Sequence, residues 1–132
     1  MKVLNLTPHA VQVYDEAQFV GLEQTNPTTW IADGVQGIPV AEYPSHGVAR
    51  IGVETSPVGS SLPGVVVETT YGEATGIPHD LKGDEYLIVS LPMQNMAKSA
   101  GLASAGQMVA PYRVVRSRAD GSKVLGCMGF TY

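Results

Sequence analysis

The sequence has little of what would cross-link a small protein covalently or anchor it in a membrane. It has one cysteine, Cys127, so it can form no internal disulfide and offers no set of thiolates to a metal ion. We expect Cys127 to be a small, buried apolar residue. No apolar run approaches the roughly 20 residues that span a bilayer, and the N-terminus lacks the charged start and long apolar stretch of a secretory signal. These absences predict a cytoplasmic protein with no membrane partner.

Motifs that indicate catalysis are also missing. The sequence contains no P-loop, no nucleophile elbow and no dinucleotide-binding glycine motif. Its three histidines, His9, His46 and His79, lie far apart without metal-ligand spacing, and each is next to a turn proline or glycine. A histidine that hydrogen-bonds to turn backbone is the favoured interpretation of each. We therefore expect no metal and no cofactor, and catalysis is the weaker hypothesis.

Charge is sparse and unevenly distributed. The net charge of -4 argues against general binding to DNA or RNA, because that affinity depends on many phosphate contacts. Residues 1–81 carry two bases and nine acids, a balance of -7, whereas residues 82–132 carry six bases and three acids, a balance of +3. A local basic surface on an acidic protein favours a small anionic ligand over a nucleic-acid polymer. A solvated strand face explains the same pattern equally well.

Turn residues, by contrast, are abundant. Fifteen glycines and nine prolines favour many short strands over long helices. Short apolar or β-branched runs predict strands at residues 3–6, 10–14, 38–41, 48–53 and 65–71. The first two strands would form a kinked or edge hairpin around Pro8. The segment 15–32 is irregular and is predicted to be a loop with one helical turn, and 56–64 is predicted to be a mobile loop.

The C-terminal half has clearer patterns. The apolar run 86–91 predicts a strand that is buried on both faces at the centre of the sheet. Pro92 suits the first turn of a helix, because its missing amide hydrogen would have no partner there, and Gly101 would end that helix.

The dipeptide Asp120-Gly121 is a strong two-residue hairpin signal. It predicts two long strands within residues 109–130, with a register that pairs Arg116 with Leu125. Together the predicted elements give a single α+β domain, residues 1–132, with a mostly antiparallel β-sheet and one short helix after the central strand.

Arginine and aromatic residues of the C-terminal half form the best candidate binding site. On a continuous strand, Arg113 and Arg116 point to opposite faces, so the two side chains diverge. Arginine suits phosphate because its planar fork gives two parallel charge-assisted hydrogen bonds. One arginine beside Tyr86 or Tyr112 would fit a nucleotide, with the phosphate on the guanidinium and the base on the ring. Asn95, in the first turns of the predicted helix, would hydrogen-bond to the base or the ribose.

Each of these residues also has a structural explanation. Tyr86 would belong to the core, Asn95 would be solvated, and the arginines would keep the edge of the hairpin soluble. The N-terminus of the predicted helix, near Pro92, is a favourable place for an anion in either case.

Four segments of the chain resemble a family of small phage and prophage proteins. They are Leu4-Asn5-Leu6-Thr7-Pro8-His9, Gly47-Val48-Ala49-Arg50, Tyr86-Leu87-Ile88-Val89-Ser90 and Val124-Leu125-Gly126-Cys127. The matches span both ends and most of the chain, apart from an apparent insertion around residues 15–37. This group resembles the phage anti-Thoeris sponge proteins, which sequester glycosyl-cyclic ADP-ribose signals, and in some members cyclic oligonucleotides, without cleaving either.

The resemblance implies a homo-oligomer in the cytoplasm of the host cell that holds a small anionic nucleotide ligand. It implies ligand contacts from an aromatic residue, an asparagine and arginines, for which this sequence offers Tyr86, Asn95, Arg113, Arg116 and Arg50. Exposed apolar residues of the methionine-containing helix are expected to form the oligomer contact, because methionine adapts to such surfaces. We therefore expect an anti-defence protein that sequesters a cyclic nucleotide-like immune signal. An enzyme that cleaves such a signal through His46 or His79, and a phage structural or interaction protein, are the alternatives.

Overall fold

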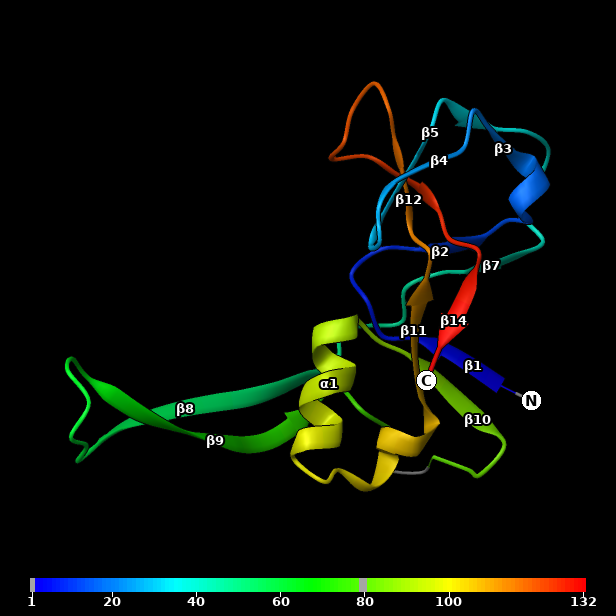
Figure 1. Ribbon diagram of the computed structural model, residues 1–132. Helices are drawn as coiled ribbons and strands as arrows, with labels where there is room; N and C mark the ends of the chain where they lie inside the picture. Colours follow the sequence, from blue (N-terminus) through cyan, green and yellow to red (C-terminus); the bar gives the residue numbers. More distant parts are fainter. Residues whose placement is uncertain (1, 79–80) are drawn as a thin grey trace.

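Two apolar cores divide the molecule into two lobes, one above the other in Figure 1. The computed structural model describes residues 2–78 and 81–132. The helical lobe contains β1 (Lys2–Asn5), β10 (Glu85–Ile88), α1 (Leu91–Ser99), the 3₁₀ turn η2 (Ala103–Gln107), β11 (Met108–Tyr112) and β14 (Gly129–Thr131). The β lobe contains β2 (Val11–Val13), the 3₁₀ turn η1 (Glu16–Gln18), β3 (Phe19–Val20), β4 (Glu23–Asn26), β5 (Thr29–Ala32), β6 (Gly34–Val35), β7 (Ala41–Tyr43), β12 (Val115–Ser117) and β13 (Val124–Gly126). Two further strands, β8 (Arg50–Val58) and β9 (Val66–Thr75), form a long hairpin, here named the arm.

The sheet of the helical lobe has the order β1-β10-β11-β14. Strands β1 and β11 run parallel to β10, and β14 runs antiparallel to β11. The prediction of a mostly antiparallel sheet is therefore wrong for this lobe, and the fold is an α+β fold with mixed sheets. The cause is the helix, because α1 lies between β10 and β11 in sequence and such a crossover connects parallel strands. The predicted position of β10 inside the sheet is confirmed, and its Leu87 and Ile88 are fully buried.

Helix α1 begins and ends where its local signals predict. The Ser90 hydroxyl caps it by accepting a hydrogen bond from the Met93 amide at 3.3 Å, and Gly101 follows it with a left-handed φ of 68°. Met93 is buried in the core of the helical lobe, and Met96 packs against that core. Among the apolar residues of this helix Leu91 is exposed, and the expectation that exposed apolar residues of α1 form an oligomer contact stays a prediction. Within the described residues, no helix has the length and apolar character required to cross a membrane.

The β lobe contains strands that the sequence patterns do not predict. Its main sheet has the order β13-β12-β5-β4, in which β12 pairs with β5 in parallel. The segment 15–32, predicted to be a loop, holds β3, β4 and β5, while the predicted helical turn is confirmed in η1. These strands have two to four residues each, and β4 is exposed throughout, so they carry little of the alternation that marks a longer strand.

The structure also differs from both predicted hairpins, one near the N-terminus and one near the C-terminus. Strands β1 and β2 do not pair with each other, because β1 pairs with β10 and β2 pairs with β7. The predicted strand 109–118 breaks into β11 and β12 at Arg113, which has a φ of 51°. Across the last hairpin Arg116 pairs with Val124 rather than with Leu125, because an irregularity in β12 shifts the register by one residue.

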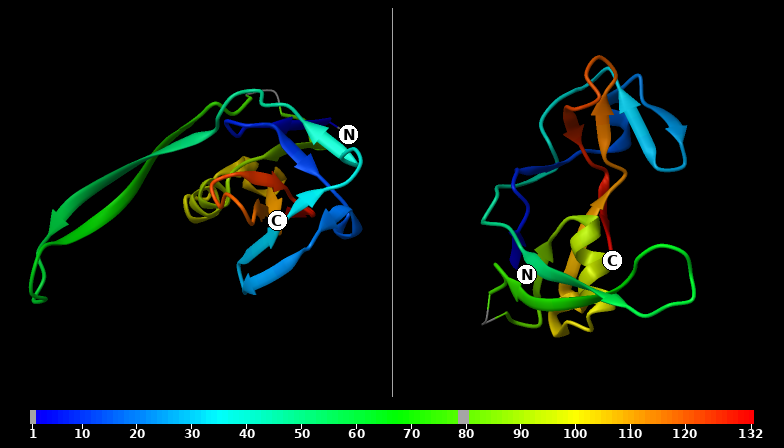
Figure 2. Two further views of the ribbon diagram at one scale, coloured as in Figure 1. Left: turned by 90° about the horizontal axis from the view of Figure 1, so that it is seen from above. Right: turned by 90° about the vertical axis from the view of Figure 1, so that its left-hand side faces the viewer.

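The arm leaves the helical lobe and projects past the rest of the molecule (Figure 2). The predicted mobile loop 56–64 is only partly a loop, since β8 continues to Val58 and β9 begins at Val66. The two strands pair antiparallel over almost their whole length, with an irregularity between Ile51 and Val53.

Candidate functional site

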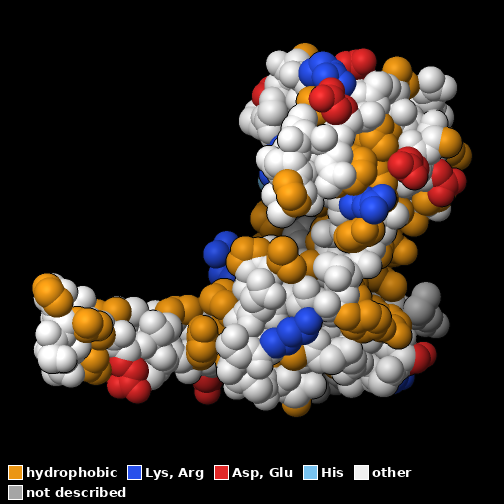
Figure 3. Space-filling view, viewed as in Figure 1, with side chains coloured by type: hydrophobic (Ala, Val, Ile, Leu, Met, Phe, Trp, Pro, Cys, Tyr) orange, Lys and Arg blue, Asp and Glu red, His pale blue; other side chains and the backbone are white. Residues whose placement is uncertain are grey.

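A cleft of about 760 Å³ lies between the two lobes. This volume falls in the range of sites that hold a drug-sized ligand. Residues from both lobes line it, among them Pro8, Trp30, Ser90 and Arg113. Figure 3 shows hydrophobic side chains gathered where the lobes meet. Among the described lining residues Arg113 is the one lysine or arginine, and none is an aspartate or glutamate, so the cleft favours an anion.

One wall of the cleft is the turn that follows β1, and the buried side chain of Asn5 shapes this turn. Its amide Nδ2 donates hydrogen bonds to the carbonyl oxygens of His9 and Tyr43, each at 2.8 Å. Its Oδ1 accepts hydrogen bonds from the Thr7 amide at 3.0 Å and from the Thr7 hydroxyl at 2.6 Å. Asn5 thereby satisfies both ends of its own amide and fixes Pro8 and His9 at the cleft. The Asn-Leu-Thr-Pro-His segment of the resemblance is thus a rigid cleft wall.

The N-terminus of α1 reaches the cleft on the side of the helical lobe. Ser90 and Leu91 line the cleft, and Ser90 and Pro92 line a second, smaller hollow of about 350 Å³. The unpaired amides of a helix N-terminus carry partial positive charge, which adds to the preference for an anion.

Arg113 lies at the point where β11 ends and the chain passes into the β lobe. Its guanidinium carbon lies 4.9 Å from the centre of the Trp30 ring and 5.1 Å from that of the Tyr112 ring. These are cation–π distances. Within the part of the chain that the structure describes, Arg113 has no ion pair and its side chain makes no hydrogen bond. The guanidinium therefore has N–H donors that are free to bind a ligand.

Arg113 also has an unusual backbone. Among the described residues it is the one non-glycine residue with a positive φ, at 51°. Left-handed backbone costs a side-chain-bearing residue about 1–2 kcal/mol, and such residues are concentrated at functional sites. This backbone conformation separates β11 from β12 and places Arg113 beside Trp30. Trp30 lies on β5, which pairs in parallel with β12.

Trp30 is the cleft residue that the sequence analysis missed. It lies on β5, within the segment predicted to be a loop, and it is half-buried. The chain has one tryptophan, and Thr29 and Ile31 on either side of it are β-branched. That short run is the signal that favours a strand with an aromatic residue on one face.

Arg50 is the second predicted ligand residue that lies beside a hollow. It is exposed at the start of β8 and lines the smaller hollow. This hollow shares Pro8 and Ser90 with the cleft, so the two are neighbours on either side of the α1 N-terminus.

The other three predicted ligand residues line neither the cleft nor the smaller hollow. Tyr86 lies in the sheet of the helical lobe, where its ring packs edge-on against Tyr132 with ring centres 6.3 Å apart, and a hydrogen bond between the two raises the pKa of the Tyr132 phenol. Asn95 is exposed on α1. Arg116 is exposed on β12 and donates a hydrogen bond from Nη1 to the Gly121 carbonyl at 3.3 Å.

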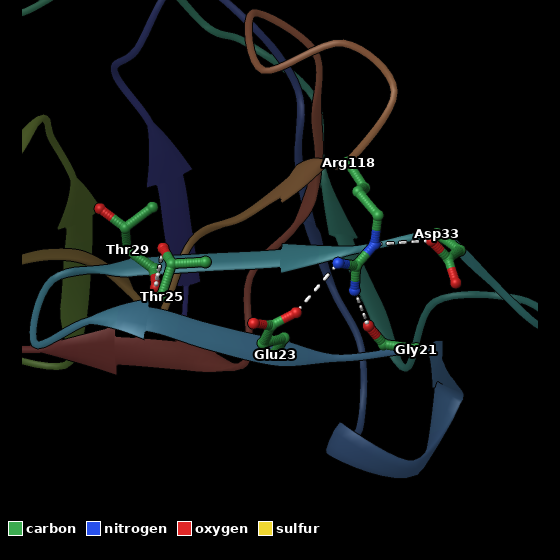
Figure 4. A network of polar contacts seen from close by, with 6 residues as sticks. All are labelled: Gly21, Glu23, Thr25, Thr29, Asp33 and Arg118. Carbon is green, nitrogen blue, oxygen red and sulfur yellow. Dashed lines mark hydrogen bonds and ion pairs between the residues drawn. The ribbon is translucent and has the colours of Figure 1, made fainter.

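Arg118 is held in a network of its own (Figure 4). Its Nε donates to Asp33 at 2.8 Å, its Nη1 to Glu23 at 2.9 Å and its Nη2 to the Gly21 carbonyl at 2.8 Å. The hydrogen bond with Glu23, followed by that with Asp33, raises the pKa of Arg118 further. This network joins the basic C-terminal half to the acidic N-terminal half inside the β lobe.

The histidines and the cysteine form no catalytic set in the described part of the chain. His9 lines the cleft, whereas His46 lines neither hollow and its backbone amide donates to the Asn5 carbonyl at 2.8 Å. His79 lies outside the described residues. No group of three histidine, cysteine or acidic side chains in the described ranges is arranged to hold a metal ion. Cys127 is buried as predicted, and burial raises the pKa of its thiol.

The fold and the cleft define a small α+β protein with a ligand-sized, arginine-bearing cleft between its two lobes. Comparison with known proteins found no family model, no curated protein and no solved structure that matches the chain.

Proposed function

We propose that this protein binds and sequesters a small anionic nucleotide, of the cyclic ADP-ribose or cyclic oligonucleotide type, and acts as a phage anti-defence protein. The observation that carries the proposal is Arg113, which makes cation–π contacts with Trp30 and Tyr112 at a cleft of about 760 Å³. The four-segment resemblance to small phage proteins adds the biological setting, the cytoplasm of an infected host.

The chemistry of the cleft suits the parts of a nucleotide. The free N–H groups of Arg113 would bind phosphate, and charge-assisted hydrogen bonds of this kind contribute about 1.5–3 kcal/mol each. Tyr112 is 44% exposed, so its ring is available to a base, and stacking of a base on an aromatic ring contributes about 1–3 kcal/mol. Arg50, across the α1 N-terminus, would bind a second phosphate of a ligand long enough to enter both hollows.

Sequestration is favoured over cleavage by what lines the cleft. General acid–base catalysis needs titratable side chains in reach of the reacting atoms. Among the described lining residues His9 is the one histidine, and no carboxylate accompanies it. A cleavage reaction through His46 would have to take place outside both hollows.

The test is isothermal titration of the purified protein with cyclic ADP-ribose isomers and cyclic di- and trinucleotides, followed by chromatography of the ligand that heating releases. We expect saturable binding and unchanged ligand. Arg113→Gln should weaken binding at least tenfold, because it removes a charge-assisted contact. Arg116→Gln removes the same charge outside the cleft and should leave the affinity within about twofold.

Three results would contradict the proposal. Converted ligand would favour an enzyme, and an equal loss from Arg116→Gln would move the site away from the cleft. No binding across the panel would favour an interaction protein, the alternative that the exposed arm supports.

A further inference from the structure

The arm is the part of the molecule that makes the fewest contacts with the rest of the chain. Strands β8 and β9 pair with each other and with no other described strand. A two-stranded hairpin is at best marginally stable alone in water. Beyond its first residues almost every side chain of the arm is exposed, and Figure 2 shows it projecting away from both lobes.

The register of the arm separates its side chains into two different faces. Directly paired residues in antiparallel strands share a face, and successive pairs alternate. The pairs Val53–Tyr71, Thr55–Thr69 and Pro57–Val67 therefore lie on one face, here named the uncharged arm face. The pairs Glu54–Thr70, Ser56–Glu68 and Val58–Val66 lie on the other, and both acidic residues of this stretch are there.

The uncharged arm face continues the core of the helical lobe. Ile51 and Ala74 form the pair at the base of the arm on the same face. Ile51 is buried in that core and Ala74 packs against it. Further along, Val53, Tyr71 and Val67 are 47%, 40% and 48% exposed. An apolar surface that leaves the core and runs into solvent is typical of a surface that another molecule covers.

We propose that the uncharged arm face docks on the same face of a second copy of this chain, so that two arms pack face to face about a two-fold axis. Around such an axis each residue approaches its own counterpart or a near neighbour, so a charge on the face would meet a like charge. The face carries none, and Glu54 and Glu68 point away from it. The face is thus electrostatically complementary to itself.

The size of the face agrees with a dissociable dimer. Nine strand residues extend about 30 Å, and a two-stranded ribbon with its side chains is about 10 Å wide. Two such faces bury about 600 Å² in total, to which the exposed tip residues Leu62 and Val65 add, so the interface is smaller than that of a stable dimer and suits a weak one. The dimer should therefore form and dissociate over an accessible range of protein concentration.

Two matched substitutions test the face by sedimentation velocity over a concentration series. Val67→Glu places a charge on the uncharged arm face and should weaken the dimer at least tenfold. Val58→Glu places the same charge on the opposite face of the arm and should leave dimerisation within about twofold. Both positions are exposed, at 48% and 40%, so both variants should keep the circular dichroism spectrum of the parent protein. A protein that is monomeric at all concentrations, or equal effects of the two variants, would overturn the proposal.

A cross-link tests the face-to-face arrangement itself. Thr55 lies in the middle of the face, close to the expected two-fold axis, so Thr55→Cys should form a disulfide-linked dimer on mild oxidation. Glu54→Cys, on the opposite face, should not, and the native Cys127 is buried and should not compete. Dimerisation without the Thr55→Cys cross-link would place the arm on another surface of the partner and overturn the proposal. The inference does not depend on nucleotide binding, and neither experiment contains a ligand.

Discussion

Arg113 shows how one residue links backbone strain to a binding role. Its left-handed φ of 51° ends β11, and its guanidinium makes cation–π contacts with Trp30 and Tyr112. A cation–π contact contributes about 0.5–1 kcal/mol at an exposed site, which is less than or similar to the cost of the left-handed backbone. Folding therefore gains little from this arrangement, whereas a phosphate ligand would gain an oriented donor.

Cys127 gives a prediction about pH at the same scale. Burial raises the pKa of its thiol in the folded state, so the unfolded chain loses this proton at a lower pH than the folded protein does. The stabilising contribution is complete below the ordinary thiol pKa and is lost as the pH rises from that value through the raised pKa of the folded state, by at most about 1.4 kcal/mol per pH unit. Urea unfolding of the parent protein and of Cys127→Ala, followed above neutral pH, measures it. The free energy of unfolding of Cys127→Ala should fall less with rising pH than that of the parent protein. An equal fall in both proteins would contradict a raised pKa of the Cys127 thiol.

At the scale of elements, Gln94 connects α1 to the sheet beneath it. It is 1% exposed, and its Nε2 donates to the carbonyl oxygens of Met108 on β11 and Thr131 on β14, each at 3.1 Å. A buried amide with two backbone acceptors from two strands fixes the helix in one position on the sheet.

Gln94→Ala should therefore lower the free energy of unfolding by about 1–3 kcal/mol, because two buried carbonyl groups lose their donor. The matched control is Asn95→Ala at the next, exposed position of the same helix. It should leave stability unchanged or raise it by up to about 0.7 kcal/mol through the better helix propensity of alanine. Chemical denaturation of both variants measures the difference. Equal changes in the free energy of unfolding for Gln94→Ala and Asn95→Ala would contradict a stabilising role for the two hydrogen bonds of Gln94.

The elements that the sequence predicts correctly are those with local causes. Pro92 and Gly101 mark α1 within ten residues, and the apolar run of β10 places it inside the sheet, although the predicted strand 86–91 runs on into the N-cap Ser90 and the first helical residue Leu91. Strand pairing has non-local causes and was predicted poorly. The pairing of β12 with β5 joins Val115 to Trp30, which lies 85 positions earlier in the chain, and no short pattern encodes it.

The same distinction applies to the candidate site. Arg113 was a candidate because of its residue type, and its partner Tyr112 is its neighbour in sequence. Trp30 comes to the cleft only through the β12–β5 pairing, so the sequence analysis could not place it there. The one-residue error in the predicted partner of Arg116 has a similar origin. A strict alternation of side chains along a strand does not predict the irregularity between Val115 and Arg116.

At the scale of the whole molecule, the arginines of this unevenly charged chain fall into two groups, those in ion pairs and those without one. Arg118 is neutralised within the β lobe by Glu23 and Asp33. Arg113 and Arg50 lie beside the cleft and its neighbouring hollow and have no ion pair in the described part of the chain. Two of the cations that lack an ion pair therefore lie at the hollows beside the α1 N-terminus, while the acidic arm projects away from the lobes.

The most direct test of the central claim uses Trp30, because it is the one tryptophan of the chain and it lines the cleft. Its fluorescence is measured while cyclic ADP-ribose isomers and cyclic oligonucleotides are added to the parent protein and to Arg113→Gln. The account predicts a saturable change in Trp30 emission with one of these ligands, at the affinity that calorimetry gives, and at least a tenfold weaker response in the variant. Binding by calorimetry that leaves the emission of Trp30 unchanged, or no binding at all, would contradict a nucleotide site in this cleft.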